Sequence, residues 1–249
     1  MIRIQHLTKI FNAGKEDEVQ ALQDVSLDIE KGSFVVVIGS NGSGKSSLLN
    51  LILGSIFPTS GKIFINEHEL TRQPEHLRSK WISMVFQNPG NGTAPDLSIL
   101  ENFRLASLRS TSKKMKIGID NHFRLMVKEK ISALGMGLEN KLEQPMGSLS
   151  GGQRQALTLL MGVMDKTDIL LMDEPTAALD PKSAQIILQL ASEINKTLGI
   201  TVVLITHSLK DALQYGNRLL LFKSGTVVKD LDEKQKQQLA LSDLYEWFA

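Results

Sequence analysis

Residues 39–46 read Gly-Ser-Asn-Gly-Ser-Gly-Lys-Ser, and this octapeptide constrains the fold of the chain more than any other segment. It lies between an apolar run typical of a buried strand (33–38) and a segment with helical spacing (45–53). Glycines let consecutive backbone N–H groups turn toward one centre, and the following helix presents the positive end of its dipole to the same point. The segment therefore predicts a site for the phosphates of a nucleotide.

Two side chains of this loop have a predicted role of their own. Lys45 supplies a positive charge for the β- and γ-phosphates, and the Ser46 hydroxyl can ligate Mg²⁺. A glycine-rich turn that merely caps a helix is the alternative, and the flanking strand and helix favour the phosphate site. We expect the whole loop and the residue after it to contact the nucleotide: Gly39, Ser40, Asn41, Gly42, Ser43, Gly44, Lys45, Ser46 and Ser47.

A second apolar strand, 168–172, runs directly into Asp173 and Glu174. Ligands of parallel sheets bind beyond the carboxyl ends of the strands, so we expect both carboxylates beside the phosphates. Asp173 is predicted to hold Mg²⁺, directly or through water, and Glu174 to polarise the attacking water as a general base. A strand that ends in acids is common on protein surfaces, but together with Lys45 and Ser46 it predicts nucleotide hydrolysis.

Strand-like and helical segments alternate along the chain, which predicts an α/β fold with a largely parallel sheet. The runs 2–7 and 22–29 are assigned instead to an antiparallel β edge, and 182–198 is predicted to be a helix. The tail 232–249 is expected to be an amphipathic helix packed on its own domain, with a partner contact as the alternative. The strands assigned to the alternating pattern are 33–38, 62–65, 81–86, 168–172, 201–205 and 218–222.

Composition and charge exclude several classes of protein. The formal net charge of +1 argues against a direct nucleic-acid partner, and the absence of cysteine excludes disulfides. The apolar runs are far shorter than the roughly 20 residues that span a bilayer, and the N-terminus does not read as a signal peptide. The segment 102–130 holds eight Lys or Arg and two acids, which indicates either a solvated face or a surface near a partner or anionic lipid headgroups.

Residues 149–153, Leu-Ser-Gly-Gly-Gln, come between the phosphate loop and the acidic strand and open another predicted helix. A hydroxyl and free N–H groups at a helix start form a second anion site. This segment resembles the signature of ABC ATPases, many of which are the ATP-hydrolysing subunits of membrane transporters. The resemblance implies that two copies pack head to tail, each signature closing on ATP held by the other copy. The signature residues that contact this ATP are then Ser150, Gly151, Gly152 and Gln153.

Four further positions match the family in order and spacing. The resemblance implies that Gln87 reaches Mg²⁺ and the attacking water, and that Asp180, in a loop after the acidic strand, crosses the dimer interface. It implies that His207 contacts the γ-phosphate and that Phe11 stacks on adenine, where family members more often have tyrosine. The other histidines are interpreted as structural: His6, His68, His76 and His122.

The resemblance covers essentially the whole chain and implies one P-loop NTPase domain, 1–249. A RecA-like core with its β subdomain is expected at 1–88 and 166–249, and an inserted α-helical subdomain at 89–165. The cofactors implied are ATP and Mg²⁺. The partners implied are a second copy in an ATP-sandwich homodimer, integral-membrane permease subunits and an extracytoplasmic substrate-binding protein. The protein is then peripheral, at the cytoplasmic face of the plasma (inner) membrane.

The loop after Gln87 resembles that of bacterial importers with lipoprotein-type binding proteins, some of which handle amino acids. Two other functions stay open: a signalling or cell-division ATPase that acts on a membrane partner, and a nucleic-acid-associated ABC ATPase. The second class usually has a long coiled coil between the phosphate loop and the signature. Only about 100 residues separate Lys45 from Leu149, so the sequence favours the transporter subunit.

Overall fold

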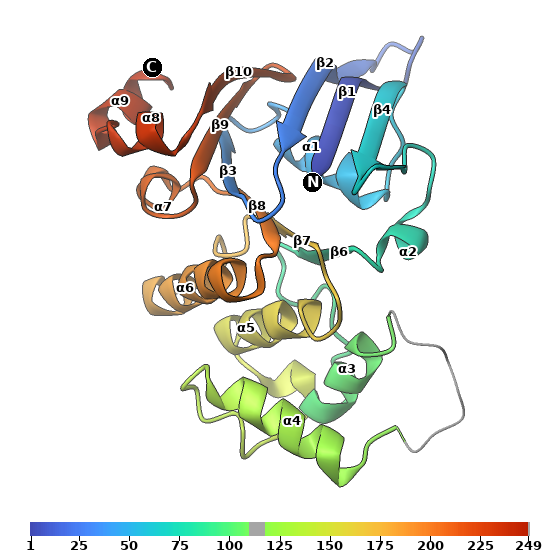
Figure 1. The fold of residues 1–249 in the computed structure, drawn as a ribbon, viewed down its shortest axis with the longest axis vertical. Coiled ribbons are helices and arrows are strands. Elements are labelled where there is room, and N and C mark those ends of the chain that lie inside the picture. The colour runs from blue at the N-terminus through green and yellow to red at the C-terminus, as the bar shows by residue number, and fades with distance from the viewer. Residues whose placement is uncertain (110–117, 249) are drawn as a thin grey trace.

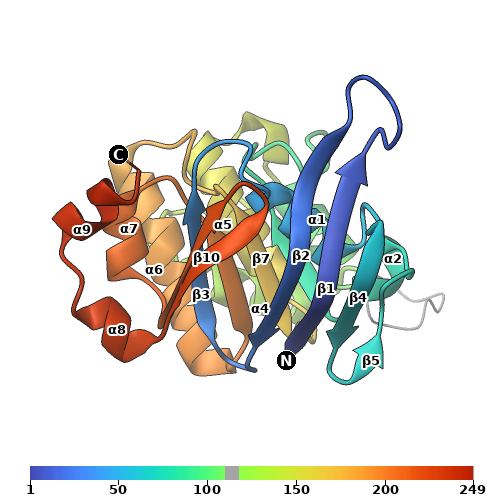
Figure 2. The ribbon, with the colours of Figure 1, turned by 90° about the horizontal axis from the view of Figure 1, so that it is seen from above.

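The computed structural model describes residues 1–109 and 118–248, which form two β-sheets with a helix between them and further helices around them (Figures 1 and 2). The larger sheet has the order β10-β9-β3-β8-β7-β6. All its neighbours pair in parallel except β10, which pairs antiparallel with β9, so the predicted largely parallel sheet is confirmed. Its strands are β3 (Phe34–Gly39), β6 (Ile82–Val85), β7 (Ile169–Asp173), β8 (Thr201–Ile205), β9 (Arg218–Lys223) and β10 (Thr226–Leu231).

The smaller sheet has the order β2-β1-β4-β5 and is antiparallel, which confirms the β edge predicted from the first two runs. The assignment of 62–65 to the parallel pattern is wrong, because Ile63 pairs antiparallel with Ile4. Asn66 and Glu67 both have positive φ, which makes a tight hairpin turn into β5 instead of the crossover that a parallel strand needs. The strands are β1 (Ile2–Phe11), β2 (Val19–Ile29), β4 (Ser60–Ile65) and β5 (His68–Glu69).

Both faces of the larger sheet are covered, which explains why its strands are apolar almost throughout. Successive strand residues point to opposite faces. Val35 and Val37 therefore pack with α1 (Lys45–Leu53) and the smaller sheet. Val36 and Ile38 pack with the helices on the other face. The phosphate loop thus joins a strand and a helix that are both held in the core.

The regular elements in the described part of the chain between β6 and β7 are all helical, as predicted, and loops join them. Figure 1 shows these helices at one end of the molecule, with α5 nearest the sheet. No helix among the residues that the structure describes is long and apolar enough to cross a membrane. The elements of this segment are α3 (Ile99–Ala106), α4 (Asn121–Ser132), a 3-10 turn (Met146–Ser148) and α5 (Gly151–Gly162), and the other helices before the tail are α2 (Glu75–Arg78), α6 (Pro181–Leu198) and α7 (Leu209–Gln214).

Arg78 closes the far end of α1, opposite the phosphate loop, and is fully buried. Its guanidinium donates only to backbone carbonyls, including those of Leu51 and Ile52 in the last turn of α1, each at 2.7 Å. Its Nε atom donates to Gln73 O at 2.8 Å, and its remaining nitrogen donates to two more carbonyls. The five N–H groups of the arginine therefore match five hydrogen bonds, and burial lowers its pKa to about 10.

The tail forms two short helices instead of the single amphipathic helix predicted for 232–249, which is therefore wrong. Ala240 is extended, and its N–H donates to the Asp243 carboxylate, so the chain begins a new helix there. Leu244 is fully buried, which confirms that the tail packs on its own domain, while Phe248 is 40% exposed. The two helices are α8 (Glu233–Gln237) and α9 (Leu241–Glu246).

The basic segment is not one solvated face. Arg109 turns inward, where its guanidinium donates to Ser83 Oγ, Gly162 O and Thr167 Oγ1 and ties α3 to the sheet. Burial lowers the pKa of this arginine, and the charge of Asp165 opposes that shift. Three of the predicted basic residues lie outside the described part of the chain: Lys113, Lys114 and Lys116.

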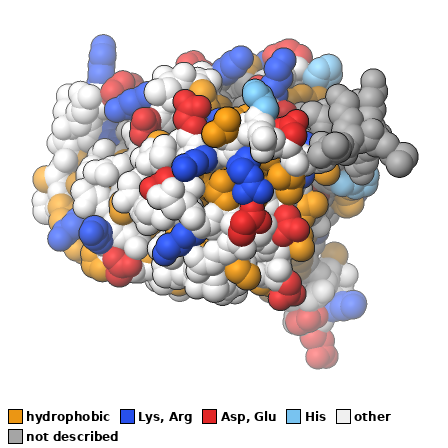
Figure 3. All heavy atoms as spheres, turned by 90° about the horizontal axis from the view of Figure 1, so that it is seen from below, with side chains coloured by type: hydrophobic (Ala, Val, Ile, Leu, Met, Phe, Trp, Pro, Cys, Tyr) orange, Lys and Arg blue, Asp and Glu red, His pale blue; other side chains and the backbone are white. Residues whose placement is uncertain are grey.

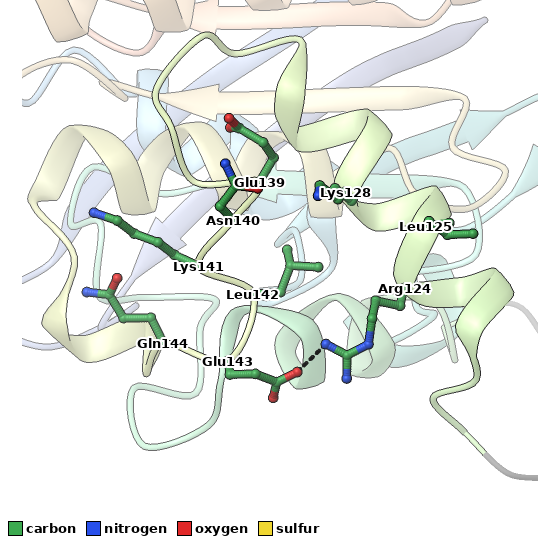
Figure 4. Close-up of a pocket in the computed structure, with 9 residues that line it drawn as sticks. All are labelled: Arg124, Leu125, Lys128, Glu139, Asn140, Lys141, Leu142, Glu143 and Gln144. Atoms are coloured by element: carbon green, nitrogen blue, oxygen red, sulfur yellow. Dashed lines mark hydrogen bonds and ion pairs between the residues drawn. The ribbon is translucent and has the colours of Figure 1, made fainter.

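Arg124 pairs with Glu143 across the mouth of a surface pocket of about 510 Å³ between α4 and the loop 139–144 (Figure 4). Lys128 projects from α4 into the same region. In Figure 3, which views this end of the molecule, Lys and Arg side chains are interspersed with Asp and Glu on the coloured surface. The positive charge of the segment is therefore partly compensated within the chain.

Candidate active site

The phosphate loop leaves β3 at its carboxyl end and enters α1 through Gly44, whose φ of 103° is open to glycine but strained for other residues. A Cβ atom at Gly44 would lie 2.4 Å from Ala21 O, so glycine is also required by the close approach of β2. The sequence places a glycine here for both reasons. The loop backbone is consequently held in one conformation by its neighbours.

Two polar groups of the loop are available to an anion. Lys45 is 4% exposed, and its Nζ donates to Gly39 O at 2.8 Å and to Ser40 O at 2.9 Å, which leaves one ammonium N–H. Burial lowers the pKa of Lys45, and the carboxylates of Glu174 and Asp173 oppose this shift. Ser43 Oγ is among the buried polar atoms of the described residues that have no hydrogen-bond partner. The Lys45 ammonium and the Ser43 hydroxyl can therefore both donate to a phosphate oxygen.

Ser46 and Asp173 are 127 positions apart in sequence but adjacent in space, as predicted. Ser46 Oγ donates to Asp173 Oδ1 at 3.1 Å, at the carboxyl end of β7. Burial raises the pKa of Asp173, the hydrogen bond from Ser46 opposes this, and the charge of Glu174 adds to it. A hydroxyl and a carboxylate together are oxygen ligands of the type that Mg²⁺ prefers, so these residues fit the metal.

Glu174 and His207 form the second contact between strand ends. His207 Nε2 lies 2.6 Å from Glu174 Oε1. The Glu174 backbone is left-handed with φ of 48°, a conformation that costs a residue with a Cβ about 1–3 kcal/mol. The surrounding structure holds it there, since Glu174 N donates to Ile205 O at 3.1 Å. Such strain is characteristic of functional positions.

Phe11 ends β1 and lines a pocket of about 330 Å³ together with Ala21, the phosphate loop and Glu174. Lys9 Nζ lies over the Phe11 ring, 4.7 Å from the ring centroid. An aromatic face at the rim of a phosphate site can stack on a base. The pocket joins three of the predicted elements in one place: Phe11, residues 41–47 with Lys45 among them, and Glu174. A neighbouring pocket of about 350 Å³ joins Gly39, Ser40 and Asn41 to His207.

The remaining predicted residues lie outside these two pockets. Gln87 is exposed just after β6, and the Asp180 carboxylate accepts from the N–H groups of Lys182 and Ser183 as the cap of α6. Ser150 caps α5, where its Oγ accepts from Gln153 N and Gln153 Oε1 accepts from Ser150 N. The helix start expected at the signature is confirmed. The start of α5 lines neither of the two pockets.

Sequence reasoning missed two buried polar residues that donate to the backbone of elements next to the site. Arg78 secures the far end of α1, and Gln155, 1% exposed, connects α5 to the ends of β6 and β7. The signal for Gln155 is a polar residue within the apolar face of α5, immediately before Ala156 and Leu157. The signal for Arg78 is weaker, because it lies in a short polar segment.

A phosphate loop at the end of a parallel strand, with carboxylates and a histidine at the neighbouring strand ends, defines a P-loop nucleoside triphosphatase. The sequence profile of the ABC transporter family matches residues 22–177, which is more than half of the chain. The chain belongs to the ABC transporter family. It is an ATP-binding and ATP-hydrolysing subunit of an ABC transporter.

Relatives of known function are similar over nearly the whole chain. A tyrosine transport ATP-binding protein of Clostridioides difficile (strain R20291) is 38% identical over 248 residues, covering 100% of this chain and 98% of that protein. A methionine import ATP-binding protein, MetN, of Haemophilus influenzae (strain 86-028NP) is 35% identical over 92% of this chain and 64% of its own length. A cassette solved as a dimer in a post-hydrolysis state with ADP and Pi is 31% identical, with a TM-score of 0.80, over 94% of this chain and 99% of that one.

Proposed function

We propose that the chain hydrolyses ATP at a site completed by a second copy of itself, and that this drives a bacterial importer. The observation that carries the proposal is the separation of two anion-binding features in one chain. The phosphate loop and Glu174 share one pocket, whereas Ser150 caps α5 on a separate surface. A head-to-tail pair brings the α5 start of each copy to the γ-phosphate held by the other. A related cassette solved as a dimer supports this arrangement.

The residues of the pocket support a hydrolytic role for Glu174. Its carboxylate accepts a proton from water as the water oxygen bonds to the γ-phosphorus, and the bond from phosphorus to the bridging oxygen of ADP breaks. His207, 2.6 Å from that carboxylate, orients it and contacts the γ-phosphate. Lys45 and the N–H groups of the loop stabilise the charge on the phosphate oxygens. Phe11 stacks on adenine.

We assign Mg²⁺ to Ser46 and Asp173, whose oxygens lie 3.1 Å apart, with Gln87 reaching it from the end of β6. When bound there, Mg²⁺ would supply positive charge beside the phosphate oxygens. Asp180, in the loop before α6, contributes to the contact between the two copies. The boundaries 1–88, 89–165 and 166–249 remain our proposed division of the chain.

We propose that the two copies bind permease subunits in the inner membrane, at their cytoplasmic face. The permease subunits then change conformation when the two copies associate and separate. An extracytoplasmic binding protein delivers the solute. A related cassette from Clostridium perfringens, 26% identical with a TM-score of 0.76, is described as part of the transporter complex cbiONQ, which supports such a partnership. Relatives named for transport of tyrosine and for import of methionine and taurine support a small amino-acid-like solute.

Glu174→Gln tests the hydrolytic site. We expect turnover to fall by at least about a hundredfold, the loss typical for a general base, while ATP binding is retained and ATP-held dimers accumulate in size-exclusion chromatography. Unchanged steady-state hydrolysis would remove Glu174 as the base.

Ser150→Arg tests the shared site separately. The larger side chain at the start of α5 is expected to block dimer formation while the monomer still binds ATP, because the phosphate loop is untouched. Introduced into Glu174→Gln, it should abolish the ATP-held dimer. Dimers that persist in the double variant would contradict the head-to-tail arrangement.

A further inference from the structure

Gln155 is a buried polar side chain on α5, 1% exposed, five residues after Ser150. Its side-chain nitrogen donates to Phe86 O at 2.7 Å and to Pro175 O at 3.1 Å. Both partners are carbonyl oxygens, which only accept hydrogen bonds, so the nitrogen and not the oxygen of the amide must face them. The orientation of the side chain is therefore determined by its neighbours.

The two carbonyls lie where adjacent strands leave the sheet. β6 and β7 are paired in parallel as far as Val85 and Met172. Phe86 and Pro175 come after the paired region, where the β-ladder no longer supplies donors to their carbonyls. Pro175 is buried and Phe86 partly buried, and a carbonyl away from water needs a donor, which Gln155 supplies to each.

Each carbonyl is next to a residue of the proposed site. The carbonyl of Phe86 belongs to the peptide group that carries the Gln87 nitrogen, and Pro175 directly follows Glu174. One amide nitrogen therefore binds the backbone both directly before Gln87 and directly after Glu174. The left-handed backbone of Glu174 needs such support, because it has a strained φ of 48°.

The same helix carries the signature at its other end. Ser150 caps α5, and α5 packs against β6 and α6 (Figure 1). A shift of α5 moves the Gln155 amide and, with it, the two backbone segments that it holds. The geometry points to Gln155 as a positioning residue that holds the backbone at Gln87 and Glu174 for hydrolysis and links it to the position of the α5 start. This inference rests on the roles proposed above for Gln87 and Glu174.

Gln155→Met tests this role, because methionine has a similar length and removes both donors. We expect kcat to fall about ten- to a hundredfold, the effect of small misplacement of reacting groups. The ATP dissociation constant and KM should stay within about twofold, because the Gln155 amide donates to Phe86 O and Pro175 O and not to the phosphate loop. Rates are expressed per folded molecule, measured by near-UV circular dichroism. A purely structural residue would lower the thermal midpoint without this split between kcat and KM.

Thr158→Val is the matched control on the same helix. Thr158 is also buried, and its Oγ1 donates to Arg154 O within α5, so the variant removes a partly buried hydrogen bond that does not reach β6 or β7. Its kcat should stay within about twofold of the parent. If Gln155→Met and Thr158→Val have the same kcat, the inference is overturned.

Glu174→Gln, measured in parallel, separates this inference from the proposed function. If Glu174→Gln retains turnover, the proposed hydrolytic site fails whatever Gln155 does. If Glu174→Gln is inactive and folded Gln155→Met has normal kcat, only the positioning role fails. Should Gln155→Met not fold, Gln155→Glu, which keeps the size and loses the donors, is measured in the same way. Failure of both to fold would make Gln155 a structural residue and overturn the inference.

Discussion

His207 Nε2 and Glu174 Oε1 lie 2.6 Å apart, so a side chain after β8 contacts the carboxylate that follows β7. The Glu174 side chain is 17% exposed and the His207 side chain 43% exposed. The histidine can therefore reach both the carboxylate and the solvent-facing side of the pocket. This relationship joins two segments that are more than thirty residues apart in sequence.

Removing the imidazole tests this contact. In His207→Ala we expect kcat to fall about a hundredfold, because the Glu174 carboxylate loses the group that orients it, while the ATP dissociation constant changes little. His6→Ala is the matched control, since His6 also lies 2.8 Å from a carboxylate, that of Asp24, but both side chains are exposed on the smaller sheet. Equal kcat in the two variants would contradict the role of His207. Steady-state phosphate release measures both.

Lys45→Ala tests the phosphate loop. The buried ammonium is a charged donor to phosphate oxygens, and its loss should raise the ATP dissociation constant at least about tenfold, or about 1.4 kcal/mol. Lys62→Ala removes an exposed lysine paired with Glu69 and should leave binding unchanged. Isothermal titration calorimetry gives both constants. An unaltered constant in Lys45→Ala would exclude this lysine from the nucleotide site.

The two signature glycines differ in the space around them. A Cβ at Gly152 would lie 2.4 Å from Ser183 Oγ and 2.6 Å from its Cβ, so α5 and α6 would have to move apart. At Gly151 the nearest atom, Leu179 Cδ2, would be 3.5 Å away. Gly152→Ala should therefore cost about 1–3 kcal/mol and lower the thermal midpoint by several degrees. Gly151→Ala should not, and equal midpoints would contradict the packing argument.

Arg78→Lys should destabilise the fold. Lysine cannot supply the five N–H donors, so several buried carbonyls lose their partner, and we expect a loss of at least about 3 kcal/mol in the free energy of unfolding. Arg72→Lys, at an exposed position nearby, should change it by less than about 0.5 kcal/mol. Urea denaturation followed by circular dichroism measures both. Similar losses in the two variants would show that the buried guanidinium is dispensable.

Because Lys236 is buried, we expect the free energy of unfolding to depend on pH. This lysine of α8 is 5% exposed, and it donates to the carbonyls of Tyr215 and Gly216. Burial lowers its pKa from 10.5 to about 8, although the charge of Glu233 acts in the opposite direction. Between about pH 8 and 10.5 the unfolded state therefore binds more protons than the folded state, and stability due to this group rises with pH.

Lys236→Met removes this titration. The difference in the free energy of unfolding, wild type minus Lys236→Met, should increase as the pH rises from 8 to 10.5 and should be flat below pH 8. Urea denaturation at a series of pH values measures it, and taking the difference cancels the titration of the other groups. A difference that falls across this range would show that the folded state favours the ammonium more than the unfolded state does.

Local features of the fold and of the site could be predicted from the sequence because they depend on residues a few positions apart. The phosphate loop requires glycine at Gly44, and the Ser150 cap depends on Gln153 three residues later. Strand and helix runs follow from the spacing of apolar residues. The strand 62–65 was misassigned because its apolar pattern suits either sheet, and the left-handed turn at Asn66 and Glu67 decides the pairing.

The sequence alone predicts a glycine-rich loop with Lys45 and Ser46, a strand that ends in two carboxylates, and a helix start at Ser150. Only the tertiary structure decided which long-range contacts hold these parts: His207 with Glu174, Arg78 with the end of α1, and Gln155 with Phe86 and Pro175. The physical reason is that a donor bonds to an acceptor within about 3 Å, and the packing of the chain decides which acceptor lies at that distance. That match depends on how strands and helices pack, and residues far apart in sequence carry no local pattern that specifies it.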